Sequence, residues 1–201
     1  MNTFGGYEGD RPAQPHRAHL RRLDAGYYRG RTVVHWTLGI HRRAVGWLNT
    51  EFHHRWDLML LHASVRYGLV SPGYVLMPDH IHLVWLGVRD DAEQRPAIEF
   101  LRRELRSALL PAAWQRQPYD HVLTRSERSR NAFQSLAHYV LQNPVRAGIA
   151  AQPADYPYSG CCVPGFPALN VHDQGYWDSF WRIHNQVLVG RDSLEGRSDW
   201  D

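Results

Sequence analysis

Apolar residues recur along this chain with two different periods, and each period predicts one kind of element. Runs of β-branched and aromatic residues are typical of strands, and steps of three and four residues are typical of amphipathic helices. Strand-like runs cover residues 31–40, 69–77, 80–86 and, more briefly, 120–123. Helical spacing covers residues 43–66, 97–110, 129–142 and 176–183. The chain is therefore expected to combine helices with a sheet.

The order of these elements narrows the fold class. Strand, helix, strand, strand, helix and a short strand follow one another, as in a ferredoxin-like α+β sandwich. We expect a central antiparallel sheet with the first two helices on one of its faces. Three regions are predicted: a mobile basic arm over residues 1–30, a main domain over 31–150, and an extension over 151–201 that is rich in proline, glycine and aromatic residues and packs on the domain.

Two histidines begin one of the strand-like runs. His80 and His82 come directly after a break at residues 77–79. Alternate residues of a strand share a face, so the two imidazoles are expected side by side, roughly 7 Å apart along the strand. Neutral imidazole is the commonest nitrogen ligand, and such a pair can hold one metal ion. An isolated pair of this kind is more often a pair of surface or core histidines.

A tyrosine and an asparagine lie four residues apart near the end of the 129–142 helix. Tyr139 and Asn143 are predicted on one side of that helix, at the border of its apolar stripe. Pro144 is expected to end the helix, because the residue before a proline is displaced from helical geometry. The two side chains could supply a nucleophile and a metal ligand. Separately, each is more often a packing residue or a helix cap.

Charge favours a polyanionic partner without establishing one. The 23 basic residues, all of them arginine, exceed the 20 acidic residues and give a net charge of +3. Arg102, Arg103 and Arg106 are predicted on the outer side of the 97–110 helix, where they are either a solvated face or phosphate contacts. Trp85 and Trp114 could stack bases, although core packing is the commoner role of such residues.

The spacing of the cysteines argues against a zinc-finger protein, and the hydropathy argues against a membrane-spanning one. Cys161 and Cys162 are adjacent and have no metal-finger spacing. No apolar stretch reaches the about 18 residues that a membrane span needs. We therefore expect a reduced, cytoplasmic protein with no membrane partner.

Two motifs together resemble a known family. Met77-Pro78-Asp79-His80-Ile81-His82 is followed by Tyr139, three residues, and then Asn143-Pro144-Val145-Arg146-Ala147-Gly148. This combination resembles the single-tyrosine HUH transposases, and in particular their REP-associated tyrosine transposase branch on bacterial chromosomes. The resemblance covers about residues 31–181 and includes the segments 119–123 and 156–161.

The resemblance implies a fold, a site and a reaction. It implies the ferredoxin-like sheet, with His80 and His82 as metal ligands, Asn143 as the third ligand and Tyr139 as the nucleophile. The implied reaction is metal-dependent nicking and rejoining of single-stranded DNA through a 5′-phosphotyrosine, with Mg²⁺ or Mn²⁺, on hairpins of the repetitive extragenic palindrome type. Arg146 joins the three helix arginines as a candidate DNA contact. The resemblance also implies a nucleoid-associated monomer or homodimer.

Two departures from the family motif and two alternative functions remain at this point. Thr124 follows the short fourth strand-like run where the family usually has arginine, and Arg125 comes one place later, so a DNA contact there is not expected with the family's spacing. Asp79 stands where the family often has asparagine, and strand alternation predicts that it points away from the histidines. A catalytically silent, domesticated protein that binds hairpin DNA or RNA is the main alternative. A metal-dependent hydrolase built on His80 and His82 is the other, although no acidic residue with suitable spacing accompanies them.

Overall fold

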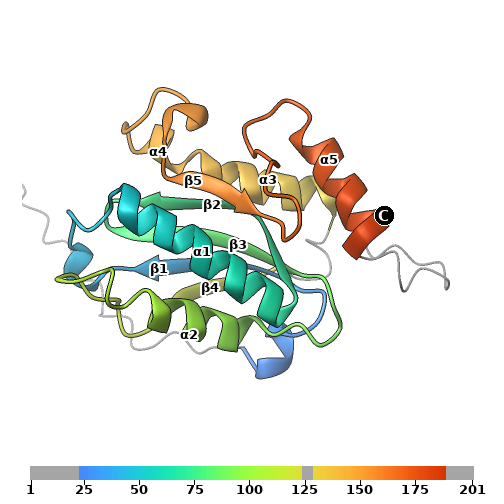
Figure 1. The fold of residues 1–201 in the computed structure, drawn as a ribbon, viewed down its shortest axis with the longest axis horizontal. Helices are drawn as coiled ribbons and strands as arrows, with labels where there is room; N and C mark the ends of the chain where they lie inside the picture. Colours follow the sequence, from blue (N-terminus) through green and yellow to red (C-terminus); the bar gives the residue numbers. More distant parts are fainter. Residues whose placement is uncertain (1–22, 124–128, 189–201) are drawn as a thin grey trace, which may run out of the picture.

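A five-stranded antiparallel sheet forms the centre of the computed structural model, which describes residues 23–123 and 129–188 (Figure 1). The strand order is β4-β1-β3-β2-β5. The strands are β1 (Val33–Gly39), β2 (Leu69–Met77), β3 (His80–Gly87), β4 (Tyr119–Val122) and β5 (Ser159–Cys162). The predicted α+β class and the central antiparallel sheet are confirmed.

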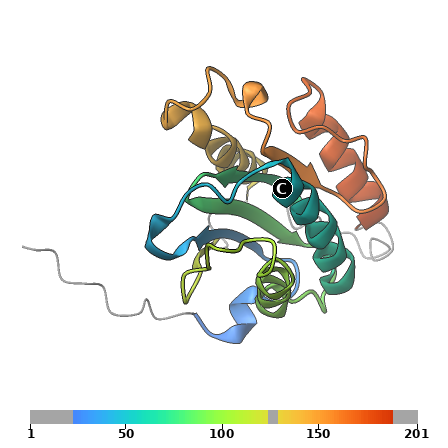
Figure 2. The same ribbon diagram turned by 60° about the vertical axis from the view of Figure 1, so that its left-hand side comes forward.

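Helices cover both faces of the sheet, and each face has its own apolar core. Helices α1 (Thr50–Tyr67) and α2 (Gln94–Glu104) lie side by side over one face, as predicted (Figures 1 and 2). Their apolar sides pack on Trp36, Leu83 and Trp85. Helices α3 (Arg130–Leu141) and α5 (Tyr176–Ile183) belong to the core of the opposite face. Trp85 is fully buried and is a core residue.

Helix α1 begins seven residues later than its apolar spacing predicts. Asn49 accepts a hydrogen bond from the backbone N–H of Phe52 at 2.8 Å, and this cap fixes the start at Thr50. Before it, Arg42 and Arg43 have left-handed backbone angles, with φ of 56° and 54°, in a short turn over His41–Arg43. Gly68 adopts the left-handed conformation that closes the helix.

Other features of the helices and strands also differ from the prediction. Helix α2 ends at Glu104, and residues 105–110 form turns. Helix α3 ends at Leu141, and a separate short helix, α4 (Asn143–Arg146), carries Pro144 in its first turn. Proline is tolerated there because the first backbone N–H groups of a helix have no partner. Strand β5 was not predicted, because proline and glycine surround it in the sequence; it pairs with β2.

Most of the predicted basic arm, residues 1–22, lies outside the described residues. Its end is ordered: residues Ala25–Tyr28 form a 3-10 turn, and the Tyr28 hydroxyl donates to Asp120 at 2.5 Å. Tyr28 is 1% exposed, so this part packs on the domain. The departure from the family motif at residues 124–125 also lies outside the described residues.

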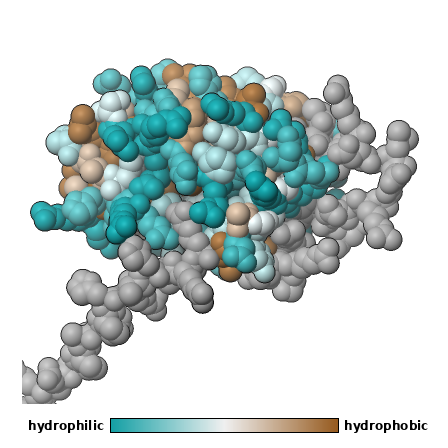
Figure 3. All heavy atoms as spheres, turned by 90° about the horizontal axis from the view of Figure 1, so that it is seen from below, coloured by the Kyte–Doolittle hydropathy of each residue, from teal (hydrophilic) through white to brown (hydrophobic). Residues whose placement is uncertain are grey.

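The surface is mostly hydrophilic on the face shown in Figure 3, with apolar residues in small scattered groups. Within residues 23–123 and 129–188, no helix combines the length and the apolar character that crossing a membrane would require.

Candidate active site

The two predicted histidines lie on the sheet face that α3 covers. In an antiparallel pair, directly opposed residues point to the same face. His82 is opposite Val75 and His80 is opposite Met77, and both partners belong to the core beneath α3 and α5. The alternate residues Ile81 and Leu83 belong to the other core, as the alternation predicted.

Helix α3 packs directly on β2 on this same face. Gly73 marks the contact, because a Cβ built there would lie 3.6 Å from Cδ1 of Leu141 and 3.8 Å from Cβ of Ala137. Phe133 and Val140 complete the buried stripe of the helix. The helix that carries Tyr139 therefore lies on the same side of the sheet as His80 and His82.

The imidazole rings of His80 and His82 touch through their outer nitrogens. Their Nε2 atoms are 3.0 Å apart and the ring planes are perpendicular. Two ligands that bind one cation at about 2.1 Å and at right angles have this separation. The geometry of the pair therefore fits a shared cation.

Asp79 contacts His80 and does not point away from it, which corrects the prediction. Nδ1 of His80 donates to Oδ1 of Asp79 at 2.6 Å, and Nε of Arg43 donates to Oδ2 at 2.6 Å. Burial alone would raise the pKa of Asp79, but the hydrogen bonds from His80 and Arg43 lower it. Alternation fails here because Pro78 and Asp79 form the turn before β3. A proton held on Nδ1 leaves the Nε2 lone pair of His80 available to a metal.

His82 is supported from the neighbouring strand β1. Its Nδ1 lies 3.0 Å from Nε2 of His35 and 3.2 Å from Oγ1 of Thr37, and either atom can accept its proton. Burial lowers the pKa of His82 to about 3, assisted by His35, His80 and Arg146. Burial and the nearby His121 likewise lower the pKa of His35 to about 4. His82 and His35 are therefore neutral at neutral pH, and the neutral imidazole is the form that binds a metal.

His35 and Thr37 were missed in the sequence. Their signal is alternation on a strand, but only the register that places Thr37 opposite His82 brings them to the site. No motif in the chain specifies that register.

Tyr139, Asn143 and Arg146 form one cluster at the end of α3. Tyr139 is 53% exposed, and the guanidinium carbon of Arg146 lies 3.8 Å from its ring centroid. Asn143 donates to the carbonyl of Val140 at 2.8 Å, and its Oδ1 accepts from Arg146 at 2.9 Å. The Tyr139 phenol is therefore accessible. The Asn143 oxygen that was predicted as a metal ligand accepts a hydrogen bond from Arg146.

The predicted DNA-contacting arginines divide between the two faces. Arg146 belongs to the Tyr139 cluster, and its charge contributes to the low pKa of His82. Arg102, Arg103 and Arg106 lie on α2 and the turn after it, on the opposite side of the sheet. The structure does not bring these three to the histidine pair.

A second exposed tyrosine shares the histidine face. Tyr119 on β4 is opposite Thr37, which is itself opposite His82, and Tyr119 is 52% exposed. Exposure therefore does not single out Tyr139 as the nucleophile.

The donor set around the histidines is small. In the described ranges, 23–123 and 129–188, no three His, Cys, Asp or Glu residues come together as a metal-binding group. A cation held by His80 and His82 would need further oxygen ligands, and the Asn143 amide, water and phosphate are of the right chemical type.

Comparisons with known proteins agree on one relative. No family model matches the chain. The REP-associated tyrosine transposase of Escherichia coli (strain K12) is 24% identical over 138 residues, which are 66% of this chain and 78% of that protein. A solved structure described as the REP-associated tyrosine transposase bound to a REP hairpin aligns with a TM-score of 0.59 and 19% identity, over 71% of this chain and 81% of that one.

A weaker likeness links the chain to a bacterial tRNA(His) guanylyltransferase-like protein in complex with GTP. It has a TM-score of 0.46 and 12% identity, over 80% of this chain and 93% of that chain. At this level the likeness supports no functional conclusion.

Proposed function

We propose that this chain, a distant homologue of the REP-associated tyrosine transposase with the same α+β fold, nicks and rejoins single-stranded DNA with Tyr139 as its nucleophile. The observation that carries the proposal is the pair of Nε2 atoms 3.0 Å apart on the sheet face that the Tyr139 helix covers. A cation site and an accessible phenol on one face are the parts that this reaction requires.

The reaction transfers a phosphoryl group between oxygen atoms. The Tyr139 hydroxyl loses its proton to solvent and its oxygen attacks the phosphorus. The bond to the 3′-oxygen breaks, and that oxygen takes up a proton from solvent and leaves as a hydroxyl. The product is a 5′-phosphotyrosine, and attack by a 3′-hydroxyl reverses the step and restores the phenol. Because each step exchanges one phosphate ester for another, rejoining needs no energy cofactor.

Charge is the main obstacle, because a phosphodiester is anionic and tyrosine hydroxyls ordinarily ionise near pH 10. A divalent cation bound by His80 and His82 would polarise a non-bridging phosphate oxygen and offset the charge of the transition state. Arg146 adds a guanidinium directly over the Tyr139 ring, on the side of the nucleophile. Asp79 and His35 orient the two imidazoles.

The donor chemistry favours Mn²⁺ over Mg²⁺. Two imidazole nitrogens suit manganese, whereas magnesium prefers oxygen ligands. Asn143 can join as the third ligand if its Oδ1 exchanges the hydrogen bond from Arg146 for the cation.

The same hydrogen bond supports a second candidate, a hairpin-binding protein that does not cut DNA. Arg146 covers the Tyr139 ring and also engages Asn143 Oδ1, so one side chain occupies both predicted reactive groups. If Arg146 keeps this position when DNA binds, the protein would recognise its ligand without forming a covalent bond.

The proposed substrate is single-stranded DNA beside a hairpin, since the aligned structure is of a protein bound to a REP hairpin. The test is incubation of the full chain with a labelled hairpin that carries an unpaired flank, with Mn²⁺, followed by denaturing electrophoresis. A covalent protein–DNA band that is lost in Tyr139→Phe and after chelation supports strand transfer. Hairpin binding without such a band supports the second candidate.

A further inference from the structure

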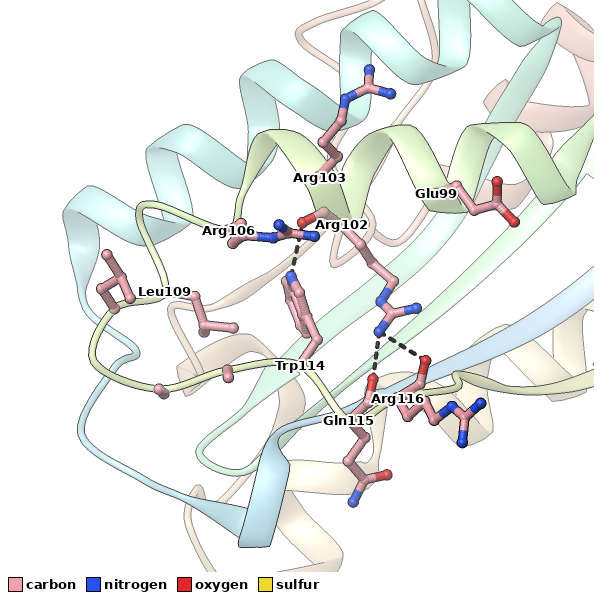
Figure 4. Close-up of a pocket in the computed structure, with 11 residues that line it drawn as sticks. Glu99, Arg102, Arg103, Arg106, Leu109, Trp114, Gln115 and Arg116 are labelled. Carbon is pink, nitrogen blue, oxygen red and sulfur yellow. Dashed lines mark hydrogen bonds between the residues drawn. The ribbon is translucent and has the colours of Figure 1, made fainter. Parts of the chain in front are cut away.

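A cavity of about 540 Å³ lies between α2 and the segment 109–116, apart from the candidate active site (Figure 4). Four arginines line it against a single carboxylate, and Trp114 stands in its centre. The charged residues are Glu99, Arg102, Arg103, Arg106 and Arg116. Such a cavity suits a ligand that is both anionic and aromatic.

The wall of the cavity is held in place by hydrogen bonds. The indole N–H of Trp114 donates to the carbonyl of Arg102 at 2.9 Å, and the Arg102 guanidinium donates to the carbonyls of Gln115 and Arg116. Arg102 therefore holds this segment against α2. The Trp114 ring is half-buried with a fixed orientation, so little conformational entropy is lost when a ligand stacks on it.

Two other arginines are available to a ligand. Arg106 and Arg116 are exposed and lie on either side of Trp114 (Figure 4). Among the residues that the structure describes, neither side chain has a hydrogen-bond or ion-pair partner. Arg103 instead points away from Trp114, pairs with Glu104 at 3.0 Å and lies over the Phe100 ring.

The cavity adjoins the end of the sheet where the histidine pair begins. The backbone N–H of Gln115 donates to the carbonyl of Gly39 at 2.8 Å, and Gly39 is the partner of His80 across the two strands. Ile40 forms a bridge with Trp114, and its N–H donates to the carbonyl of Asp79 at 3.1 Å. A strand that crosses this end of the sheet would pass from one site to the other.

We propose that the cavity binds an unpaired nucleotide of the DNA strand that leads to the candidate active site, with its base on Trp114 and its flanking phosphates on Arg106 and Arg116. Stacking on an aromatic ring and contacts with arginine are the interactions by which proteins hold single strands without reading their sequence. The assignment rests on the proposed function only for the identity of the ligand as DNA.

The test is the affinity for a fluorescein-labelled, unpaired DNA strand of about 12 nucleotides, measured by anisotropy at several salt concentrations. All proteins carry Tyr139→Phe, so no cleavage intervenes. Removing both phosphate contacts in Arg106→Ala/Arg116→Ala should reduce the slope of log K against log salt by about 1.4, or about 0.7 for each contact. Arg182→Ala, an exposed arginine on α5, is the matched control and should change neither affinity nor slope.

The tryptophan variants separate stacking from charge. Trp114→Leu should weaken binding roughly tenfold with an unchanged salt slope, whereas Trp114→Phe, which keeps an aromatic face, should lie near the parent. Both variants lose the indole hydrogen bond to Arg102, so the difference between them reports stacking alone. Thermal unfolding of each variant checks that it is folded.

Three outcomes would overturn the assignment. The first is equal affinity for the strand in the double arginine variant and the Arg182→Ala control. The second is equal affinity in the two tryptophan variants. The third is displacement of the strand by a free mononucleotide at a concentration as low as the dissociation constant of the strand. These results are independent of the covalent band. If the covalent band is absent while the cavity variants still weaken binding, the proposed function fails and the cavity assignment stands. If the band forms while the cavity variants bind as the parent does, the proposed function stands and the cavity assignment fails.

Discussion

Oδ1 of Asp79 lies 2.6 Å from Nδ1 of His80, and the other oxygen of the same carboxylate is held by Arg43. A carboxylate in this position fixes which nitrogen carries the proton and orients the ring toward a metal. The turn at Pro78 and Asp79 thus supplies support for the first of the two histidines.

Removing this support should weaken metal binding. We expect Asp79→Ala to lower the affinity for Mn²⁺ about 10- to 100-fold, because His80 loses the acceptor that orients it. Asp79→Asn keeps an acceptor oxygen, so its affinity for Mn²⁺ should lie between those of the wild type and Asp79→Ala. Isothermal titration with Mn²⁺ alone, without DNA, measures the effect, and unchanged affinity in Asp79→Ala would show that the carboxylate does not position a ligand.

Arg146 should oppose metal binding while it assists the reaction. In Arg146→Ala, Oδ1 of Asn143 loses its donor and the histidines lose a nearby positive charge. The affinity for Mn²⁺ should therefore rise, by up to about fivefold for one partly exposed charge. Covalent adduct should form more slowly, because the guanidinium over Tyr139 is gone. Arg146→Lys keeps the charge and is the control; a fall in Mn²⁺ affinity in Arg146→Ala would contradict this account.

Two glycines of the sheet should differ sharply in their tolerance of alanine. A Cβ at Gly87 would overlap the backbone carbonyl of Gly30, whereas a Cβ at Gly39 would meet only the end of the flexible Gln115 side chain. We expect Gly87→Ala to lower the free energy of unfolding by about 3 kcal/mol and Gly39→Ala by less than about 1 kcal/mol. Urea denaturation measures both, and equal losses would contradict the packing described for Gly87.

His184 should make stability depend on pH. This residue is 3% exposed beside Phe180 and Trp181, and burial lowers its pKa from 6.5, assisted by the charges of Arg31 and Arg130 and opposed by the hydrogen bond with Asn185. The unfolded chain then binds this proton more readily than the folded one. Stability is fully present above pH 6.5, the unfolded value, and is lost as pH falls toward the lower folded pKa.

The variant His184→Gln isolates this contribution. His35, His53, His82 and His172 also have pKa values lowered by burial and act in the same direction, so the wild-type curve contains the contributions of all five histidines. Urea denaturation at pH values from 7.5 to 5 should give a shallower decline in the variant. An identical decline in both proteins would show that His184 is not protonated differently in the two states.

Long periodic elements were predicted well, and contacts set by register or turns were not. The helix predicted over residues 129–142 runs over Arg130–Leu141, and the strand predicted over 80–86 is His80–Gly87. In both cases the buried stripe or face decides the element. The start of α1 depends on the cap at Asn49, and β5 depends on pairing with β2, which local propensity does not report.

In the candidate site too, the features that follow from strand alternation were predicted and those that depend on register or turns were not. The shared face of His80 and His82 follows from strand alternation, and their outer nitrogens do meet. The contacts of Thr37 and His35 with His82 require the register of β1 on β3, and Asp79 escapes alternation because it lies in the turn. Arg102 looked like a phosphate contact, but its guanidinium is bound to two backbone carbonyls of a segment more than ten residues away.

The site of covalent attachment tests the central claim most directly, because two exposed tyrosines, Tyr139 and Tyr119, share the histidine face. After reaction of the full chain with hairpin DNA and Mn²⁺, nuclease and protease digestion followed by mass spectrometry identifies the modified residue. We predict a nucleotide on Tyr139 that is absent in His80→Ala/His82→Ala and retained in Tyr119→Phe. A nucleotide on Tyr119, or one on Tyr139 that forms equally well without the two histidines, would contradict the account.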